Sequence, residues 1–387
     1  MARFEDLSRL LEQFVKNGPA GCSCAVAKDG KTLYHGCFGY ADLEEKRPVT
    51  EDTVFRLFSM TKVITCTAAM MLFEKGKFLL NEPIYEYIPE YRDTQVFVTE
   101  PDGSVHTEKA KNPMLIKHAF NMSVGIPYPF IDTPTSREMI KVREELSKKY
   151  GKYDILTEVK AMGSVPVAFE PGTHWLYGYG HDIIAGLIEV ITGKSIGQFL
   201  QDEIFGPLDM KSTGYRYHGD IESRMASYYR KNNKGEMIKI SVEEDQFHKP
   251  DALYESGGIG LYSTVGDYIK FSQMLANGGL YYKNRIIGRK TIDLMRTNHL
   301  NEEQLKDIGG SYLAGYGYGL GVRTLMSNAE GHSNGSVGEF GWTGMAGTYV
   351  SIDPKEGSSI VYMHQMDPNM EEYHHLRVRA VANGCLE

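Results

Sequence analysis

The first part of the chain has a pattern of apolar and polar positions that predicts a helix followed by a hairpin. Residues 1–14 place apolar side chains at helical spacing between charged ones, which is typical of an amphipathic helix. Two runs rich in apolar residues follow at 22–27 and 32–38, and Asp29-Gly30 lies between them. Such runs around an Asp-Gly turn predict a β-hairpin.

The middle of the chain alternates between helical and polar segments. Residues 58–73 are small or apolar almost throughout, which predicts a buried helix of about four turns. The runs 94–99 and 104–107 flank another Asp-Gly pair and indicate a small hairpin. A further helix is expected at 182–192, and Gly193 is a suitable residue to end it.

Strand patterns return near the end of the chain and define the expected domain organisation. We expect strands at 319–323, 348–353 and 359–363, and a last helix at about 371–382. The early hairpin and the late strands are expected to join one antiparallel sheet. This predicts a discontinuous α/β sandwich domain of residues 1–80 and 255–387, with a mostly helical domain of residues 81–254 inserted between its two parts.

Composition and charge narrow the class of protein. The chain has 387 residues, of which 42% are hydrophobic and 24% charged, as in an ordinary soluble enzyme. Its net charge is −8 and its basic residues are not clustered, so neither nucleic acid nor an anionic membrane surface is an expected partner. No apolar stretch approaches the roughly 18 residues that span a bilayer. The N-terminal segment also lacks the features of a signal peptide, and we expect a cytoplasmic protein.

The five cysteines fit a reducing compartment, because their number is odd and their spacing is not that of a metal site. Cys22 and Cys24 alternate along a predicted strand and therefore face the same side. We interpret them as small buried hydrophobic residues. The twelve histidines show no metal-binding spacing, so no metal is expected. His118 and His181 are interpreted as structural.

Ser59 and Lys62 are the residues with the clearest chemical meaning. Positions three apart share a face of a helix, so the Ser59 hydroxyl and the Lys62 amine are expected to meet. A serine hydroxyl needs a neighbouring base to become a nucleophile. A lysine amine among apolar neighbours loses the solvation that stabilises its charged form, and can accept a proton near neutral pH. Ser-x-x-Lys also occurs by chance, with the serine as a helix cap.

Two later motifs supply the other groups that an acyl transfer needs. Tyr177 lies in the loop before the 182–192 helix, where it could relay a proton between Lys62, Ser59 and a leaving group. Residues 338–348 are rich in glycine and precede a strand, which lets a substrate carbonyl approach the backbone. The N–H groups of Met345 and Ser59 could then form an oxyanion hole. Taken alone, Tyr177 would be better explained by packing, and the glycine-rich segment by a turn between strands.

Taken together, these motifs resemble those of the penicillin-recognising serine hydrolases in order and approximate spacing. In detail the chain resembles the family VIII carboxylesterases, which are relatives of the class C β-lactamases. The resemblance covers nearly the whole chain and is carried, besides the three motifs, by the segments Tyr40-Ala-Asp-Leu-Glu, Phe73-Glu-Lys-Gly-Lys, Ile84-Tyr-Glu-Tyr-Ile-Pro-Glu, Asn121-Met-Ser-Val-Gly-Ile, Phe205-Gly-Pro-Leu-Asp-Met and Gly257-Gly-Ile-Gly-Leu-Tyr-Ser-Thr.

Two departures from the β-lactamase pattern favour an esterase. The Tyr-x-Asn of class C enzymes is here Tyr177-Gly178-Tyr179, and the Lys-Thr-Gly triplet is here Trp342-Thr343-Gly344. The chain thus lacks, at those places, the amide and the cation that would hold a β-lactam. Arg323 or another cation could still reach the β-lactam carboxylate from elsewhere in the fold.

The resemblance implies a β-lactamase/transpeptidase-like α+β fold and a serine esterase that uses no cofactor. It implies the nucleophile Ser59, the proton carriers Lys62 and Tyr177, and an oxyanion hole made by Ser59 and Met345. Trp342, Gly344, Tyr179 and Tyr128 would bind a small ester substrate with a short acyl group.

Several alternatives stay open at this stage. Within the same fold, the chain could be a β-lactamase, a D-amino-acid peptidase or an acyltransferase, or a non-catalytic binding protein. Gly331-His-Ser333-Asn-Gly335 also matches the nucleophile elbow of α/β-hydrolases, and Asp353 and His364 follow it in order. We reject this elbow because the glycine-rich residues after Ser333 do not predict the helix that an elbow requires.

Overall fold

The computed structural model describes residues 4–386, apart from the side chains at positions 244 and 311. Its main feature is an eight-stranded antiparallel sheet with the strand order β12-β13-β14-β15-β16-β1-β2-β3. The strands come from the two ends of the chain: β1 (Gly21–Lys28), β2 (Lys31–Asp42), β3 (Arg47–Pro48), β12 (Tyr316–Tyr318), β13 (Arg323–Leu325), β14 (Phe340–Thr343), β15 (Tyr349–Asp353) and β16 (Ser358–His364). The expected union of the early hairpin with the late strands is therefore confirmed.

The prediction of a strand at residues 319–323 is wrong for most of that range, because only Arg323 lies in a strand, β13. Residues 319–322 form the turn between β12 and β13, closed by a 2.7 Å hydrogen bond from Gly319 N–H to Val322 O. Gly321 has a φ of +89°, a conformation that glycine adopts without steric cost. A Cβ at this position would lie 2.3 Å from Cys66 Sγ. The glycines therefore serve the turn, although the alternation Gly-Leu-Gly-Val looks like a strand.

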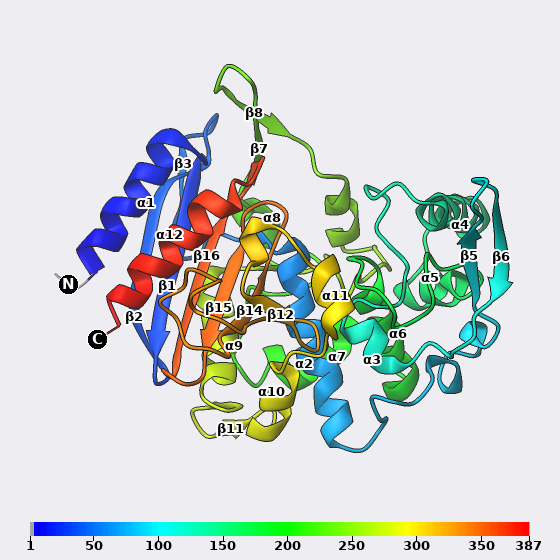
Figure 1. The fold of residues 1–387 in the computed structure, drawn as a ribbon. Coiled ribbons are helices and arrows are strands. Elements are labelled where there is room, and N and C mark those ends of the chain that lie inside the picture. The colour runs from blue at the N-terminus through cyan, green and yellow to red at the C-terminus, as the bar shows by residue number, and fades with distance from the viewer. Residues whose placement is uncertain (1–3, 387) are drawn as a thin grey trace.

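Helices cover both faces of the sheet (Figure 1). On one face α1 (Glu5–Asn17) and α12 (Glu371–Gly384) run side by side. Apolar residues of α1 at spacings of three and four positions are buried against this face, which also holds the fully buried Cys22 and Cys24. The expected terminal helices and the interpretation of these cysteines are confirmed; residues 1–3 of the first predicted helix lie outside the described part. On the other face α9 (Val265–Ala276) packs on β1, β15 and β16.

The segment between the two halves of the sheet is largely helical. Its hairpin of β5 (Gln95–Thr99) and β6 (Val105–Lys109) is confirmed, as is the end of α6 (Gly180–Thr192) at Gly193, which has a φ of +68°. The other helices of this segment are α3 (Ile116–Phe120), α4 (Pro134–Tyr150), α5 (Ile155–Met162), α7 (Ile196–Leu200) and α8 (Ile221–Arg224). The predicted boundaries at residues 80 and 254 stay a prediction.

Short strands outside the main sheet join distant parts of the chain. β7 (Tyr228–Lys231) pairs with β8 (Met237–Ile240) and, in parallel, with β17 (Met366–Asp367). β4 (Phe55–Arg56) pairs with β9 (Tyr262–Ser263). The remaining strands and α-helices among the described residues are β10 (Leu280–Tyr281), β11 (Asn284–Arg285), α10 (Arg289–Met295) and α11 (Glu302–Asp307).

The helix α2 (Thr61–Glu74) lies at the centre of the molecule and brings the two parts of the chain together. It packs on α6 of the helical segment, on α10 and on β14 of the sheet. Nearly all its side chains are buried, as its apolar sequence predicts. Its first turn is therefore held where the helical segment meets the sheet, and this is where Ser59 lies.

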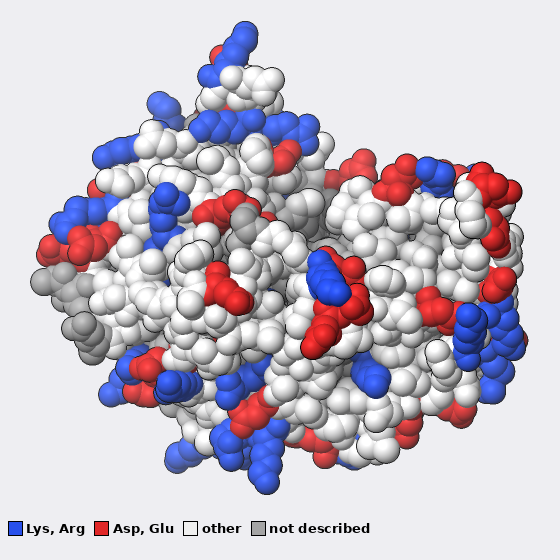
Figure 2. All heavy atoms as spheres, in the orientation of Figure 1, with Lys and Arg blue, Asp and Glu red and all other residues white. Residues whose placement is uncertain are grey.

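The surface and the helix lengths agree with the composition. On the face that Figure 2 shows, lysines and arginines are interspersed with acidic residues. Within residues 4–386 no single helix is long and apolar enough to cross a membrane. The helices Gly180–Thr192 and Ile196–Phe205 would meet that criterion of length and composition if they were counted as one, but they meet at a bend of 78°.

Candidate active site

Ser59 lies in a single turn of 3₁₀-helix, Phe58–Met60, that leads directly into α2. Phe58, the residue before it, has a φ of +45°, which is uncommon for a residue with a side chain. Burial of the Phe58 ring in a small cluster with Tyr228 and Ala346 holds this backbone in place. Strained backbone of this kind persists where the packing around it holds it in place, and it is often found at functional sites. Nothing in the sequence signals it, because phenylalanine has no preference for this conformation.

Lys62 is fully buried one turn further along, and its amine makes three contacts. Its Nζ lies 3.3 Å from Ser59 Oγ, 2.9 Å from the Tyr128 hydroxyl oxygen and 2.8 Å from Gly258 O. The expected meeting of the Ser59 hydroxyl and the Lys62 amine is thus present. An ammonium group has three N–H donors, and three acceptors surround this one.

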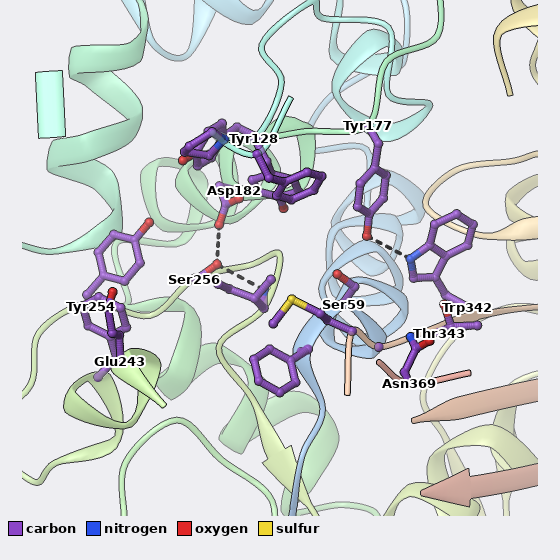
Figure 3. Close-up of a pocket in the computed structure, with 18 of the residues that line it drawn as sticks. Ser59, Tyr128, Tyr177, Asp182, Glu243, Tyr254, Ser256, Trp342, Thr343 and Asn369 are labelled. Atoms are coloured by element: carbon purple, nitrogen blue, oxygen red, sulfur yellow. Dashed lines mark hydrogen bonds between the residues drawn. The ribbon is translucent and has the colours of Figure 1, made fainter. Parts of the chain in front are cut away.

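Tyr177, which is predicted to relay a proton, has no hydrogen bond to Lys62 among the described residues, and its role stays a prediction. Its hydroxyl accepts a 3.0 Å hydrogen bond from Trp342 Nε1, and its ring lies 4.8 Å from Lys62 Nζ. Figure 3 shows the Tyr177 and Trp342 side chains pointing into the pocket near Ser59. The phenol that contacts Lys62 directly is Tyr128, for which the sequence predicts only a place in the pocket wall.

The loops that carry the two phenols are held together by their backbones. Pro127 and Gly178 form an isolated antiparallel bridge, and Tyr179 N–H donates to Ile126 O at 3.0 Å. A Cβ at Gly178 would lie 2.0 Å from Ile126 O, so only glycine allows this approach. Burial raises the pKa of Tyr128 well above its usual range, so this phenol keeps its proton near neutral pH.

Asp182 is a functional candidate that the sequence reasoning missed. It is fully buried on α6, and its Oδ1 accepts from Ser256 Oγ at 2.6 Å and from Gly258 N–H at 3.2 Å. Gly258 in turn accepts from Lys62 through its carbonyl. Burial raises the pKa of Asp182, although the charge of Lys62 acts in the opposite direction. A lone carboxylate within the apolar run of residues 180–188 was the available signal.

The turn after β14 brings the glycine-rich motif beside Ser59. Gly344 N–H donates to Thr348 O at 2.8 Å, and Thr348 Oγ1 donates to Leu57 O at 2.9 Å. A Cβ on Gly344 would lie 2.2 Å from Leu57 O, so this glycine permits close packing on the turn that carries Ser59. Met345 follows in the turn, with its side chain exposed.

These side chains line a cavity of about 560 Å³, within the range of small-molecule sites. Aromatic residues dominate its wall: Phe58, Tyr128, Phe130, Tyr177, Tyr179, Phe247, Tyr254 and Trp342. In Figure 3 Tyr254 and Trp342 lie at opposite ends of the pocket, with Ser59 between them. All the residues predicted to bind substrate therefore lie in one pocket with Ser59.

Arg323 does not replace the lysine that is absent from the triplet Trp342-Thr343-Gly344. That guanidinium is buried at 2% exposure, 3.5 Å from Glu339 Oε1, and it does not line the pocket. The rival elbow at Ser333 is also excluded by its surroundings. Ser333 lies in a loop between β13 and β14 with no helix after it, and no hydrogen bond among the described residues joins it to Asp353 or His364.

The described residues contain no group of three or more His, Cys, Asp or Glu side chains that could bind a metal ion. The pocket itself offers a buried amine beside a serine hydroxyl, two phenols and backbone N–H groups. This combination is suited to nucleophilic acyl transfer.

Comparison with known proteins identifies the family. The model of the Beta-lactamase family matches residues 7–383, and the chain belongs to that family. It is an enzyme of the class C β-lactamase-like serine hydrolases, with the β-lactamase/transpeptidase-like fold that the sequence predicts.

Individual relatives are distant but cover most of the chain. Protein Rv1367c of Mycobacterium tuberculosis (strain ATCC 25618 / H37Rv) is 28% identical over 357 residues, 91% of this chain and 87% of its own. Esterase EstB of Burkholderia gladioli is 23% identical and covers 89% of this chain and 85% of its own. The solved structure of "EstCE1, a hydrolase with promiscuous acyltransferase activity" superposes with a TM-score of 0.80 at 22% identity, over 99% of this chain and 98% of its own.

Proposed function

We propose that this enzyme is a carboxylesterase of the family VIII type, which hydrolyses small, short-acyl esters through an acyl-enzyme intermediate and uses no cofactor. The observation that carries the proposal is the 3.3 Å contact between Lys62 Nζ and Ser59 Oγ at an aromatic pocket. The names of EstB, an esterase, and of EstCE1, a hydrolase, support ester chemistry on this fold.

In the first step Ser59 Oγ attacks the ester carbonyl carbon, and its proton passes to the Lys62 amine. Lys62 is held for this task because Gly258 O accepts one of its N–H bonds. The Tyr128 phenol, which keeps its proton, can donate to the nitrogen when the amine is neutral. The carbonyl π electrons move to the oxygen and form an oxyanion.

The backbone N–H groups of Ser59 and Met345 would hold that oxyanion. Among the described residues neither N–H donates to a protein acceptor, so both are available to a ligand. Donors placed in advance where charge develops are worth more in a water-poor pocket than in bulk water. The close packing at Gly344 sets how near Met345 lies to Ser59.

In the second step the bond from the carbonyl carbon to the leaving oxygen breaks, and Tyr177 donates its proton to that oxygen. The phenolate then recovers the proton that Lys62 took from Ser59, and until then the positive charge of Lys62, 4.8 Å from the centre of the Tyr177 ring, stabilises the phenolate. The hydrogen bond from Trp342 Nε1 stabilises the phenolate that forms between these transfers. Water then attacks the acyl-enzyme, and the same groups act in reverse to release the acid and restore Ser59.

The pocket wall favours a small uncharged ester near Ser59. The rings of Trp342, Tyr179 and Tyr128 offer apolar faces to such a group, and edge or offset contacts between rings add to area burial. The substrate-binding residues Trp342, Gly344, Tyr179 and Tyr128 are retained as proposed contacts.

The nucleophile is tested by two serine variants. We expect Ser59→Ala to reduce hydrolysis of 4-nitrophenyl butyrate to the uncatalysed rate, and Ser333→Ala to keep most of the activity. An alkyl fluorophosphonate should label the wild type and Ser333→Ala, but not Ser59→Ala. Loss of activity in Ser333→Ala with retention in Ser59→Ala would overturn the proposal, and absence of both turnover and labelling in the wild type would favour a non-catalytic binding protein.

A further inference from the structure

A second cavity of about 730 Å³, between α4 and residues 243–254, adjoins the catalytic pocket. The two cavities share six lining residues: Pro129, Arg143, Glu243, Gln246, Phe247 and Tyr254. A two- to four-carbon ester fills only part of the combined space. One half of the substrate can therefore extend from Ser59 past Tyr254 into the second cavity.

Arg143 lies where the two cavities meet. It is the only lysine or arginine among the described residues that line the catalytic pocket, and it also lines the second cavity. Its side chain is 35% exposed, so the guanidinium is partly withdrawn from water but still reachable. An arginine so placed is suited to a carboxylate, because its planar fork of N–H donors matches two carboxylate oxygens.

The protein contacts of Arg143 leave donors for a ligand. Its Nε lies 3.4 Å from Glu158 Oε2 and its Nη1 lies 3.5 Å from the Tyr179 hydroxyl. Glu158 receives shorter hydrogen bonds from two tyrosines, Tyr254 at 2.9 Å and Tyr153 at 3.1 Å. The Tyr153 hydroxyl is a third neighbour of the guanidinium. A guanidinium has five N–H donors, so these neighbours do not use all of them.

Acidic groups in the pocket limit where an anion can lie. Glu371 also lines the catalytic pocket but not the second cavity, and Asp182 is buried beside Gly258. Glu243 shares the junction with Arg143, but its side chain is exposed, so water screens its charge. The second cavity is lined by two further acidic residues, Glu144 and Asp251, and by three lysines, Lys148, Lys152 and Lys249. Cations therefore outnumber acidic residues there, and Arg143 is the one that also reaches the catalytic pocket, so we assign a substrate anion to the position beside it.

The direction of the scissile ester decides which half reaches Arg143. The leaving oxygen must lie at Tyr177, whose hydroxyl is bonded to Trp342. Trp342 and Tyr254 lie at opposite ends of the pocket (Figure 3). The acyl chain then runs from Ser59 away from Trp342, towards Tyr254 and Arg143.

We propose that Arg143 forms an anion-binding subsite for the far end of the acyl group, so that the preferred substrates are monoesters of dicarboxylic acids. This inference rests on the proposed esterase chemistry, and it extends the acyl group from a short uncharged chain to a six- to eight-carbon chain that ends in a carboxylate. The carboxylate at the end of the acyl chain would bind the guanidinium while Ser59 attacks the ester carbonyl at the other end.

The test compares 4-nitrophenyl monoesters of adipic, pimelic and suberic acid with the same esters in which the free carboxylate is replaced by a primary amide. We expect kcat/KM to favour the carboxylate by about tenfold at the best chain length, as one charge-assisted contact allows. Arg143→Gln should bring this ratio to about one, and Arg143→Lys should keep part of it. Because the ratio is taken within each variant, general damage to the enzyme cancels.

Two matched variants sharpen the result. Arg137→Gln removes an exposed arginine of the same helix that is paired with Asp132 outside the pocket, and should leave the ratio unchanged. Glu243→Gln should raise the ratio, because it removes the acidic neighbour at the junction. If Arg143→Gln folds poorly, the double variant Arg143→Gln/Glu158→Gln replaces it, because it leaves no unpaired carboxylate buried at position 158. The double variant should show the same ratio of about one.

The outcomes separate this inference from the proposed function. Equal kcat/KM for carboxylate and amide esters in the wild type, or a preference that persists in Arg143→Gln, would overturn the subsite while leaving the esterase intact. A preference found only when the carboxylate is placed on the phenol half would also overturn it. Absence of turnover of all these esters, together with no fluorophosphonate labelling, would instead count against the esterase itself.

Discussion

At the scale of single residues, the arrangement around Lys62 shows what a motif can and cannot predict. The spacing of Ser59 and Lys62 predicts their contact because helix geometry alone brings them together. The contact of Lys62 with Tyr128 depends on a loop 66 positions away in the chain, and no local pattern encodes it. The same holds for the link from Asp182 through Gly258 to Lys62.

The role of Lys62 as a base leads to a prediction for a variant that keeps its charge. We expect Lys62→Arg to lower kcat for 4-nitrophenyl butyrate by at least about 100-fold, since general bases contribute on the order of 10²–10⁴ and arginine stays protonated at any working pH. Lys75→Arg, in an exposed position just after α2, is the matched control and should retain activity. Comparable activity in Lys62→Arg would show that Lys62 only positions Ser59.

At the scale of elements, the sequence predicted several regular segments and both Asp-Gly hairpins, but it did not predict the long helices α4 and α9 individually, and it mistook one turn for a strand. The helices α1, α6 and α12 and the strands β1, β15 and β16 were predictable because each buries one regular face or a continuous apolar run. The turn at residues 319–322 was mistaken for a strand because its glycines are required by a neighbour, Cys66, that is distant in sequence. The positive φ of Phe58 is likewise imposed by tertiary packing.

The packing of α12 on β16 buries three histidines and predicts acid sensitivity. Burial lowers the pKa of His374 to about 4 and that of His375 to about 3, and it lowers the pKa of His364 well below its usual range. Above the unfolded value of about 6.5 these groups are neutral in both states, so stability is fully present. As pH falls below 6.5 the unfolded chain binds protons that the folded chain does not, and stability is lost.

For His374 and for His375 the loss at pH 5 is about 2 kcal/mol each, from about 1.36 kcal/mol per pH unit. Urea unfolding followed by circular dichroism at pH 7.5 and 5.0 measures the difference in the free energy of unfolding. His375→Gln should reduce that difference by about 2 kcal/mol, whereas His106→Gln, which changes an exposed histidine of β6, should not alter it. An unchanged pH dependence in His375→Gln would contradict the assignment. Burial raises the pKa of Glu189 to about 7, so this residue makes the protein relatively more stable at pH 5.0, and it does so equally in every variant.

At the scale of the whole molecule, the fold was predictable because the same motifs occur in the same order along nearly the whole chain, and the family match over residues 7–383 agrees. The shape and charge of the pocket could not be predicted in the same way, because they depend on side chains from both parts of the chain. Arg143 is an example: it comes from an amphipathic surface helix, and only packing beside Glu158 and Tyr179 brings it to the pocket.

The distribution of charge across the pocket predicts a preference for esters over β-lactams. The triplet Trp342-Thr343-Gly344 places an indole at the end of the pocket where a β-lactam carboxylate would require a cation, and Arg143 lies at the other end. Each missing charge-assisted bond costs about 1.5–3 kcal/mol, or roughly 10- to 150-fold in binding. We expect kcat/KM for a two- to four-carbon 4-nitrophenyl ester to exceed that for a chromogenic cephalosporin by a wide margin.

A Trp342→Lys variant tests the reason for this preference. It restores a cation but removes the hydrogen bond from the indole to the Tyr177 hydroxyl, so ester turnover should fall while cephalosporin turnover stays the same or rises. A wild-type kcat/KM for the cephalosporin equal to or above that for the ester would contradict the prediction.

The pairing of β1 with β16 sets a minimum time for the sheet to form during synthesis. Cys22 lies opposite His364, so β1 lacks this neighbour until 342 further residues have been added (364 − 22). At about 5–20 residues per second this takes roughly 17–70 seconds, and completed segments otherwise fold as they emerge. For that period the hairpin of β1 and β2 exposes an apolar strand edge, which is a surface prone to aggregation. We therefore expect fragments that end before β16 to aggregate more readily than the full-length chain.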